Sequence, residues 1–377
     1  MASDLKARLR AIGGAPKPAP PSGGLVVREY EEDADPRLFR LEQAALARLG
    51  CRGAWPGAGR VLFLDTETTG LSGGAGTVAF MIGFGYLVGK RFRVEQYMMR
   101  AYSDEPMLLA KAAEMLARFD AVVTFNGDNF DLPLLESRFT MNRMRELWKA
   151  LDRLDLMHPA RRLWKRRLGS CRLDTLEREI LRRGRTGDLP GSEAPKRFFE
   201  ALKTGDFRPL DEVFEHNRLD VIALSSLLCA LGEAYAEPGL LIETADLYSM
   251  GRVLERRGED EVARRCYVAA ASPKPLSTIA ALRGEKYQAE ANRAFSVMLR
   301  RAGEWARAER VWLEMLRRRQ LGEWPLIELA KYYEHRAGRL RDALQMTETA
   351  LAIAGLETRE ALDRRRQRLK RKLEGNG

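Results

Sequence analysis

The sequence predicts a mixed α/β domain, in which helices cover a β-sheet, followed by a second domain made of helices alone. Three observations lead to this prediction. Short apolar runs alternate with amphipathic helical patterns between residues 60 and 235. Strand patterns stop after Pro238, and the sequence follows the helical period up to residue 373. A spacing of glycine and alanine recurs three times in that second region, as in arrays of paired helices.

The composition sets broad limits on the class of protein. The chain has 377 residues, of which 45% are apolar, so two or three domains with sizeable cores are expected. We found no signal-peptide pattern and no apolar run long enough to span a membrane, and we expect a cytoplasmic protein without a membrane partner. The four cysteines form no CxxC pair and are expected to be reduced, mostly core-filling thiols: Cys51, Cys171, Cys229 and Cys266.

The charge is compatible with a nucleic-acid partner but does not establish one. The formal net charge is +11 and the pI is near 9.6. Surface lysine and arginine bind phosphate backbones by displacing counterions. The same excess is found in Arg-rich proteins from GC-rich genomes, and the Ala, Arg, Gly and Leu bias of this chain fits that explanation as well.

The elements of the first domain are predicted in chain order from their periodicity. Residues 1–24 end in a Pro-, Gly- and Ala-rich stretch and should form a flexible lead-in. An extended stretch at Leu25–Tyr30 precedes a helix with one apolar face, formed by Leu38, Leu41, Ala45, Leu46 and Leu49. The core then shows strands at 61–65, 78–88, 91–100, 121–125 and 153–156, and helices at 104–119, from 129–131 onward, at 172–183 and at 209–235.

The tail repeats a unit in which glycine is followed five residues later by alanine. The three copies are Gly258 with Ala263, Gly303 with Ala308, and Gly338 with Ala343. Each continues with a bulky or apolar position and then a small or apolar one, namely Tyr267 and Ala270, Trp312 and Met315, and Thr347 and Ala350. The pattern resembles tetratricopeptide (TPR) repeats, in which glycine forms the turn and alanine lets two helices approach closely. A generic array of helical hairpins is the alternative, and the longer first interval predicts an insertion near 273–286.

The segment Asp65-Thr66-Glu67-Thr68-Thr69-Gly70 ends the first core strand. Side chains two residues apart on a strand point the same way, so Asp65 and Glu67 share a face. Two neighbouring carboxylates repel each other unless a cation lies between them, and Mg²⁺ prefers such oxygen ligands. An isolated pair of acids at a strand end is more often a solvated polar end than a metal site.

Two further segments carry candidate acids. Asp131 lies in TFNGDNFDLPLL at the start of a predicted helix, where an acid also serves as a helix cap. His216 and Asp220 are four residues apart on a predicted helix and therefore share one face, which continues in Ala223 and Leu227. A single histidine is usually structural, but a matching acid on the same face favours a functional role.

Together these segments resemble the three motifs of the DEDD, or DnaQ-like, exonuclease superfamily, in the order that this family requires. DTETTG resembles the first motif, residues 124–135 the second, and HNRLD at 216–220 the third. Residues 153–164 and 172–177 are similar to the segments between them, and the order of predicted elements is that of the ribonuclease-H-like fold. LDTETTGLSGGAGT, FNGDNFDLPLL, DLPG (188–191) and HNRLDV resemble more narrowly the YprB-type group, which also tends to carry a TPR-like C-terminus.

The resemblance predicts three parts of the chain. A flexible segment at 1–24 would precede a ribonuclease-H-like nuclease domain at 25–237, with its core at 60–235 and a mixed sheet flanked by helices. An all-α, TPR-like domain at 238–377 would end in a basic helix. The resemblance is close over 60–235 and looser over the tail, and it concerns fold before function.

The resemblance also implies an activity, which is 3′–5′ hydrolysis of the phosphodiester bonds of DNA or RNA, most simply single-stranded, with two Mg²⁺ or Mn²⁺ ions about 3.5–4 Å apart. Asp65 would contact both ions, Glu67 and Asp220 would complete one site, and Asp131 would hold the second ion through water. His216 would accept the proton of the attacking water. In the commoner histidine branch four residues separate the histidine from the last aspartate. Three separate them here, as in the tyrosine branch, which leaves open whether His216 reaches that water.

Other residues are candidates for substrate contact. Thr68 belongs to the first motif. Gly74 lies in the glycine-rich loop 73–77, which either lets a nucleic-acid backbone approach closely or is a mobile turn. Asn126 either orients a water or the 3′ end, or simply caps a strand. The remaining histidines, His158 and His335, are expected to be structural and to have no partner.

Two basic stretches have both a functional and a structural explanation. Arg162, Trp164 and Arg166 lie where backbone contact and base stacking would combine, although a solvated helix face is the commoner meaning. The run at 363–372 is likewise more often a solvated helix end than a nucleic-acid contact.

Three other functions stay open at this point. The first is a module that binds nucleic acid without cutting it, which the presence of all four acids disfavours. The second is an adaptor whose TPR-like tail holds a protein partner. The third is an endonuclease on the same fold, which would cleave circular substrates. The sequence does not distinguish DNA from RNA, single from double strands, or one oligomeric state from another.

Overall fold

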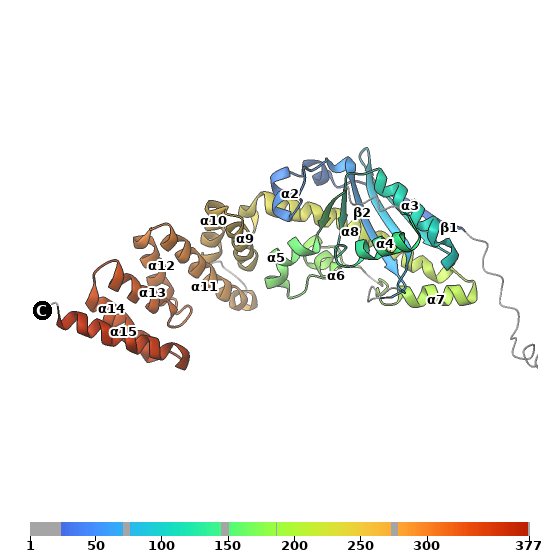
Figure 1. Ribbon diagram of the computed structural model, residues 1–377. Helices are drawn as coiled ribbons and strands as arrows, with labels where there is room; N and C mark the ends of the chain where they lie inside the picture. The colour runs from blue at the N-terminus through green and yellow to red at the C-terminus, as the bar shows by residue number, and fades with distance from the viewer. Residues whose placement is uncertain (1–23, 71–75, 145–150, 186, 273–277, 376–377) are drawn as a thin grey trace, which may run out of the picture. The chain divides into compact units, whose positions relative to one another are not determined.

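The computed structural model describes residues 24–70, 76–144, 151–185, 187–272 and 278–375, with side chains from residue 284 in the last range (Figure 1). The chain folds as two compact units. The first comprises Met1–Arg161 with Leu168–Ala236, and the second comprises Arg162–Arg167 with Glu237–Gly377. The segment 162–167 was expected in the first domain and instead clusters with the second. The predicted substrate contact Gly74 lies outside the described residues.

The first unit contains a six-stranded mixed sheet with the strand order β1-β4-β3-β2-β5-β6. The pairs β1–β4, β4–β3 and β3–β2 are antiparallel. The pairs β2–β5 and β5–β6 are parallel. This mixed sheet with flanking helices fits the ribonuclease-H-like fold predicted from the sequence. The strands are β1 (Leu25–Asp33), β2 (Val61–Thr68), β3 (Ala79–Val88), β4 (Arg91–Met99), β5 (Ala121–Thr124) and β6 (Asp152–Asp155).

The burial of the strands explains their sequences. β2 lies between β3 and β5, and its first four residues are buried, as a continuous apolar run predicts. β1 forms one edge of the sheet and alternates between half-buried and exposed positions. Its outer end is rich in acidic residues, a composition that discourages pairing with another chain.

The helices of the first unit follow the predicted order with three differences. The helix expected over 38–49 is interrupted, because Leu41 is extended and its side chain packs where Gly232 leaves room. The helix expected at 172–183 is a short α-helix followed by a π-helical turn, and a helix at Ala194–Thr204 was not anticipated. The elements are η1 (Pro36–Arg40), α2 (Gln43–Leu49), η2 (Ala58–Arg60), η3 (Tyr102–Asp104), α3 (Glu105–Ala117), α4 (Asp131–Met141), α5 (Met157–Leu168), α6 (Leu173–Leu176), η5 (Glu177–Leu181), α7 (Ala194–Thr204), η6 (Arg208–Leu210) and α8 (Asp211–Ala236).

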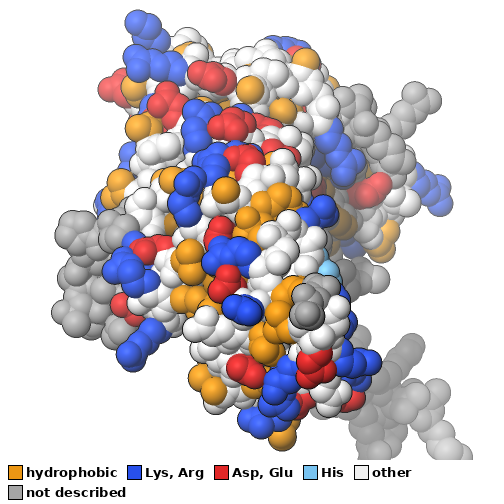
Figure 2. Space-filling view, turned by 90° about the vertical axis from the view of Figure 1, so that its left-hand side faces the viewer, with side chains coloured by type: hydrophobic (Ala, Val, Ile, Leu, Met, Phe, Trp, Pro, Cys, Tyr) orange, Lys and Arg blue, Asp and Glu red, His pale blue; other side chains and the backbone are white. Residues whose placement is uncertain are grey.

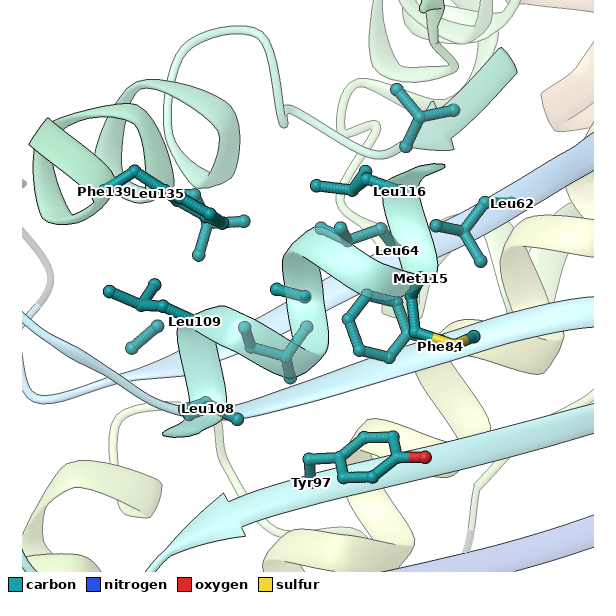
Figure 3. Packing of buried hydrophobic residues seen from close by; sticks show 14 of the residues in the cluster. Leu62, Leu64, Phe84, Tyr97, Leu108, Leu109, Met115, Leu116, Leu135 and Phe139 are labelled. Atoms are coloured by element: carbon teal, nitrogen blue, oxygen red, sulfur yellow. The ribbon is translucent and has the colours of Figure 1, made fainter. Parts of the chain in front are cut away.

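Helices α3 and α4 cover one face of the sheet. Figure 3 shows leucines and Met115 of α3 beside Leu64 and Phe84 of the strands, with Leu135 and Phe139 of α4 completing the cluster. These side chains are almost wholly withdrawn from solvent. Each Å² of apolar surface that is removed from water stabilises the fold by roughly 25 cal/mol, so this burial is the main stabilisation of the layer.

Helix α8 lies against β3 and β2 on the sheet, and two glycines of β3 make this possible. A Cβ atom on Gly83 would lie 2.2 Å from Oδ1 of Asn217, and one on Gly85 would lie 2.6 Å from Val221. The helix therefore approaches the strands more closely than larger residues would allow. The stretch Arg208–Ala236 has the length and apolar character of a membrane span, contrary to our expectation, but 67% of its most apolar window is buried inside the protein.

The second unit consists of helices throughout its described residues, after the turn η7 (Pro238–Leu240). Each predicted glycine lies in a turn between two helices with positive φ, which is 75° at Gly258, 75° at Gly303 and 68° at Gly338. The repeated alanines and the bulky and small positions that follow them are all buried. The helices are α9 (Thr244–Arg256), α10 (Asp260–Ala271), α11 (Thr278–Arg301), α12 (Trp305–Arg317), α13 (Trp324–His335), α14 (Leu340–Ile353) and α15 (Leu356–Glu374).

The basic run at 363–372 is partly neutralised inside the protein. The buried carboxylate of Glu334 accepts hydrogen bonds from Arg365 at 2.6 Å, Arg368 at 2.8 Å and Lys372 at 2.9 Å. Burial alone would raise the pKa of Glu334, but the hydrogen bonds from Arg368 and Lys372 outweigh it and lower this pKa to about 2. Figure 2 shows basic and acidic side chains interspersed on the face in view, so the positive charge is not gathered there into one patch.

Candidate active site

Asp65 and Glu67 lie at the end of β2, on the same side of the strand as Phe63. Helix α8 approaches this side, and the Asn217 amide donates a hydrogen bond to Oδ2 of Asp65 at 2.8 Å. Asn217 is itself held by the sheet, because Gln96 on β4 donates to its Oδ1 atom at 2.8 Å. The close packing of α8 on the strands thus places a fixed amide donor against the Asp65 carboxylate.

The carboxylates of the three motifs act on one another electrostatically, with Glu67 and Asp131 buried and Asp65 and Asp220 half-buried. Burial, reinforced by the charges of Asp220 and Asp131, raises the pKa values of Asp65 and Glu67 well above their ordinary values. Burial also raises the pKa of Asp131 to about 6, although a hydrogen bond from Thr66 opposes the shift. Like charges in a water-poor site are costly without a cation, so this donor set suits a hard divalent ion.

Asp131 is the first residue of α4, and the turn before it is held by the neighbouring strand. Asn126 adopts the left-handed conformation with φ 65°, and its N–H donates to Asp155 Oδ1 at 2.8 Å. Gly127 is required next to it, because a Cβ atom there would lie 2.4 Å from Thr124. Asp155 at the end of β6 thus ties down the loop that leads from β5 to α4.

The third motif presents its residues from α8, and these meet a cation of the protein itself. His216 Nε2 lies 3.5 Å from Asp220 Oδ2, as expected for residues four apart on one helix face. Arg185 donates to Asp220 Oδ1 at 2.6 Å and to Asp188 at 2.9 Å, and it also pairs with Glu177. The guanidinium therefore neutralises a carboxylate that the sequence assigns to a metal.

Four residues around this site were not predicted: Glu177, Arg185, Asp188 and Asn217. Asp188 lies in DLPG and Asn217 in HNRLDV, so both were within quoted motifs without being singled out. Glu177 ends the quoted segment 172–177 and was likewise not singled out, whereas Arg185 follows the π-helical turn and has no local signal that would reveal it. Burial raises the pKa of Glu177 to about 7, while Arg185 acts against this shift.

A cleft of about 520 Å³ opens beside these residues. His216, Asp220 and Asp188 line one part of it, and Gly191 leaves the space near the histidine ring open. Several arginines line it as well, including Arg172, whose side chain is 82% exposed. A cleft lined by both carboxylates and arginines can admit a phosphate-bearing ligand, but Asp65, Glu67 and Asp131 are not among the residues that line it.

The remaining sequence candidates lie in less direct positions. Thr68 is buried and donates to the Gly70 carbonyl at 2.8 Å, which shapes the turn after β2. Trp164 is 3% exposed, so it is neither a platform on which a base can stack nor part of a solvated helix face. Arg162, Trp164 and Arg166 belong to the second unit, and Arg166 lies over the Tyr248 ring.

The two other histidines each have an acidic neighbour, which corrects the expectation that they have none. His335 lies 3.4 Å from Glu334, and His158 lies 3.9 Å from Asp155. Asp128, Asp155 and His158 present ligand-type atoms within 4.8 Å of one another. The Asp155 carboxylate already accepts backbone N–H groups from three residues, so a structural role explains this group without an ion.

Comparison with known proteins agrees with the fold. A family model of the RNase H superfamily matches residues 62–231. An uncharacterized protein of Bacillus subtilis strain 168, YprB, is 32% identical over 322 residues, which are 83% of this chain and 75% of that protein. Among solved structures, the family B DNA polymerase of the archaeon Pyrobaculum calidifontis matches over 64% of this chain and only 30% of its own, with 14% identity and a TM-score of 0.36.

Proposed function

This chain belongs to the family of YprB and carries a domain of the RNase H superfamily at residues 62–231, and from that premise we propose that it is a divalent-metal-dependent nuclease. We further propose that it is a DEDD-type 3′–5′ exonuclease acting on single-stranded DNA or RNA. A fold alone does not assign an activity, so the proposal depends on the site.

One observation carries the proposal. Asp65, Glu67, Asp131 and Asp220 come from three separate elements, and the pKa values of the first three are raised mainly by burial, with contributions from neighbouring carboxylates. Such a cluster is unfavourable in a folded protein unless it binds something positive. Its all-oxygen donor set suits Mg²⁺ or Mn²⁺.

The residues have separate tasks in this proposal. The four carboxylates would hold two ions, which stabilise negative charge on the attacking and leaving oxygens of a phosphodiester. His216, on the same helix face as Asp220, would take the proton of the attacking water. The arginines at the rim of the cleft would attract the phosphate backbone. The glycine turns of the second unit support a TPR-like array, for which we propose a protein partner.

The test is digestion of 5′-labelled single-stranded DNA and RNA, each in linear and circular form, with and without Mg²⁺ or Mn²⁺. Wild type is compared with Asp65→Asn and with the matched control Asp33→Asn, whose side chain is 94% exposed. We expect a metal-dependent ladder on linear substrate from wild type and the control, and none from Asp65→Asn.

The other outcomes select the alternatives. Cleavage of circular substrate would replace the exonuclease proposal with an endonuclease on the same fold. Binding without cleavage of any substrate by wild type and Asp65→Asn would make the chain a nucleic-acid-binding module. Equal cleavage by wild type and Asp65→Asn would show that the carboxylate cluster is not the catalytic site.

A further inference from the structure

We propose that Asp188 is a positioning residue that selects the tautomer of His216 and thereby leaves its Nε2 atom free to accept a proton. This inference rests on the proposed nuclease function and extends it to Asp188, which lies in DLPG but was given no role there. It is carried by the contacts at the two nitrogens of the His216 ring.

The Nδ1 side of the ring faces a carboxylate. His216 Nδ1 lies 2.9 Å from Asp188 Oδ1 and 3.0 Å from Oδ2, both closer than the Arg185 guanidinium, whose Nη1 is 3.5 Å away. An ionised carboxylate only accepts hydrogen bonds, so the hydrogen of a neutral ring must be on Nδ1. Asp188 is well placed to remain ionised, because Arg185 donates to its Oδ2 atom at 2.9 Å.

The Nε2 side of the ring faces the site. With the hydrogen on Nδ1, the lone pair of the ring is on Nε2, 3.5 Å from Asp220 Oδ2 and at the wall of the cleft. A Cβ atom on Gly191 would lie 3.9 Å from Nε2, so this residue does not cover it. The opposite tautomer would place a hydrogen where the proton of water has to be received.

The support of Asp188 is rigid, as an orienting group requires. Leu189 next to it is 5% exposed and packs in the cluster formed with α7 and the start of α8. Arg185 is in turn held by Asp220 and Glu177, so the Asp188 carboxylate cannot turn away from the ring without breaking an ion pair. A carboxylate that accepts a hydrogen bond from one ring nitrogen of a histidine commonly orients the ring and fixes its tautomer, and Asp188 would act in this way.

Replacement of Asp188 by asparagine has a specific predicted effect. Because Arg185 only donates, the amide oxygen of Asn stays toward the guanidinium at the Oδ2 position, and the NH₂ group takes the Oδ1 position, 2.9 Å from Nδ1 of the ring. The NH₂ group then donates to Nδ1 and selects the tautomer with hydrogen on Nε2. Asp188→Asn is nearly isosteric, so it reverses the tautomer while the surrounding packing is kept.

The first measurement is ¹⁵N NMR of the ring nitrogens in the metal-free, full-length protein labelled at histidine, at a pH where the His216 ring is neutral. The chain has only three histidines, so His158→Gln and His335→Gln suffice to assign His216. We expect hydrogen on Nδ1 in wild type and on Nε2 in Asp188→Asn. Hydrogen on Nε2 in wild type overturns the proposal, and this result needs no variant to fold.

The second measurement uses kinetics on the best nucleic-acid substrate. Asp188→Asn should lower kcat by about 10²–10⁴-fold with little change in KM, since loss of a general base has an effect of this size. In a His216→Ala background the same change should cause no further loss, because Asp188 acts only through the histidine. If the loss of kcat from Asp188→Asn multiplies that from His216→Ala in the double variant, the proposal is overturned.

The control is Asp206→Asn, which removes an exposed carboxylate paired with Arg208 in the same unit and should leave kcat unchanged. An inactive wild type would sink the proposed nuclease function, while the NMR result would still decide the tautomer. An active wild type whose His216 carries hydrogen on Nε2 would leave the nuclease proposal standing and remove the role of Asp188.

Discussion

The Gln96 amide donates to Oδ1 of Asn217 at 2.8 Å, and this bond determines which way the Asn217 amide faces. With its oxygen engaged, Asn217 can only present its NH₂ group to Asp65, which it does at 2.8 Å. A strand of the sheet therefore orients a first-motif carboxylate through a residue of the third motif. All three side chains are largely withdrawn from solvent.

Asn217→Leu should destabilise the metal-free protein. The change removes a donor to the half-buried Asp65 carboxylate, and it leaves the Gln96 amide with the Phe214 carbonyl as its remaining acceptor. We expect the free energy of unfolding to fall by about 1–3 kcal/mol, measured by urea denaturation at pH 8. An unchanged unfolding midpoint would show that Asp65 does not depend on this bond.

The stability of the metal-free protein should depend on pH through Asp131. Its folded-state pKa is raised from 3.8 to about 6, so its contribution is fully present below the unfolded pKa and is lost as pH rises through 6. Asp131→Asn should therefore match wild type near pH 4 and become more stable by up to about 3 kcal/mol near pH 7. Thermal unfolding in chelator across this pH range checks the sign, and a difference that shrinks with rising pH contradicts it.

Arg185→Met should destabilise the metal-free protein strongly and make it more responsive to divalent ions. Removal of the guanidinium leaves Asp220, Asp188 and Glu177 without their shared partner, a loss of about 3–5 kcal/mol for a buried pair. Mg²⁺ or Mn²⁺ should restore part of the loss by neutralising Asp220. Melting temperatures with chelator and with metal measure this, and Arg60→Met, which removes an exposed pair with Asp120, should change little.

Glu334→Gln should loosen the C-terminal helix. The neutral side chain no longer compensates Arg365, whose side chain is only 15% exposed, and this leaves a buried charge unpaired at a loss of about 3–5 kcal/mol. Limited proteolysis should then release α15 earlier than in wild type. Glu348→Gln, beside exposed Lys370, is the matched control, and equal digestion rates for the two variants would contradict the prediction.

Gly83→Ala should push α8 away from the sheet. The added Cβ would lie 2.2 Å from Oδ1 of Asn217, the end of a side chain that its bonds with Gln96 and Asp65 hold in place. We expect a loss of about 1–3 kcal/mol in stability, together with weaker binding of divalent ions by the carboxylates. Gly59→Ala is the control, because nothing lies within 4 Å of the added atom.

Much of the first unit could be predicted because its signals are local. The run 61–64 is apolar and continuous, so β2 is recognisable as an inner strand, and the alternate acids of Asp65 and Glu67 stand out against it. The glycine turns of the tail were equally visible. The break in the first helix was not, because it depends on the packing of Leu41 against Gly232, far away in sequence.

Local sequence patterns could not predict the residues that surround the site, because these residues meet only through contacts between segments that are distant in sequence. Arg185 lies in an irregular segment and acquires its meaning only when α8 brings Asp220 beside it, 35 residues later. Asn217 adjoins His216 in sequence, yet it faces the sheet rather than the cleft, so the spacing rule that linked His216 with Asp220 passed over it.

The clustering of Arg162–Arg167 with residues 237–377 affects how the protein can be divided for experiments. A shortened protein ending at Ala236 would keep this segment of α5 while losing its partners, which are Asp246 for Arg167 and Tyr248 and Tyr287 for Arg166. Its exposed remnant would invite aggregation and stray binding of polyanions. Inactivity of that fragment would therefore not assign the chemistry to the tail. The chain passes between the units three times, at 161/162, 167/168 and 236/237, so no single cut yields two pieces that match the units.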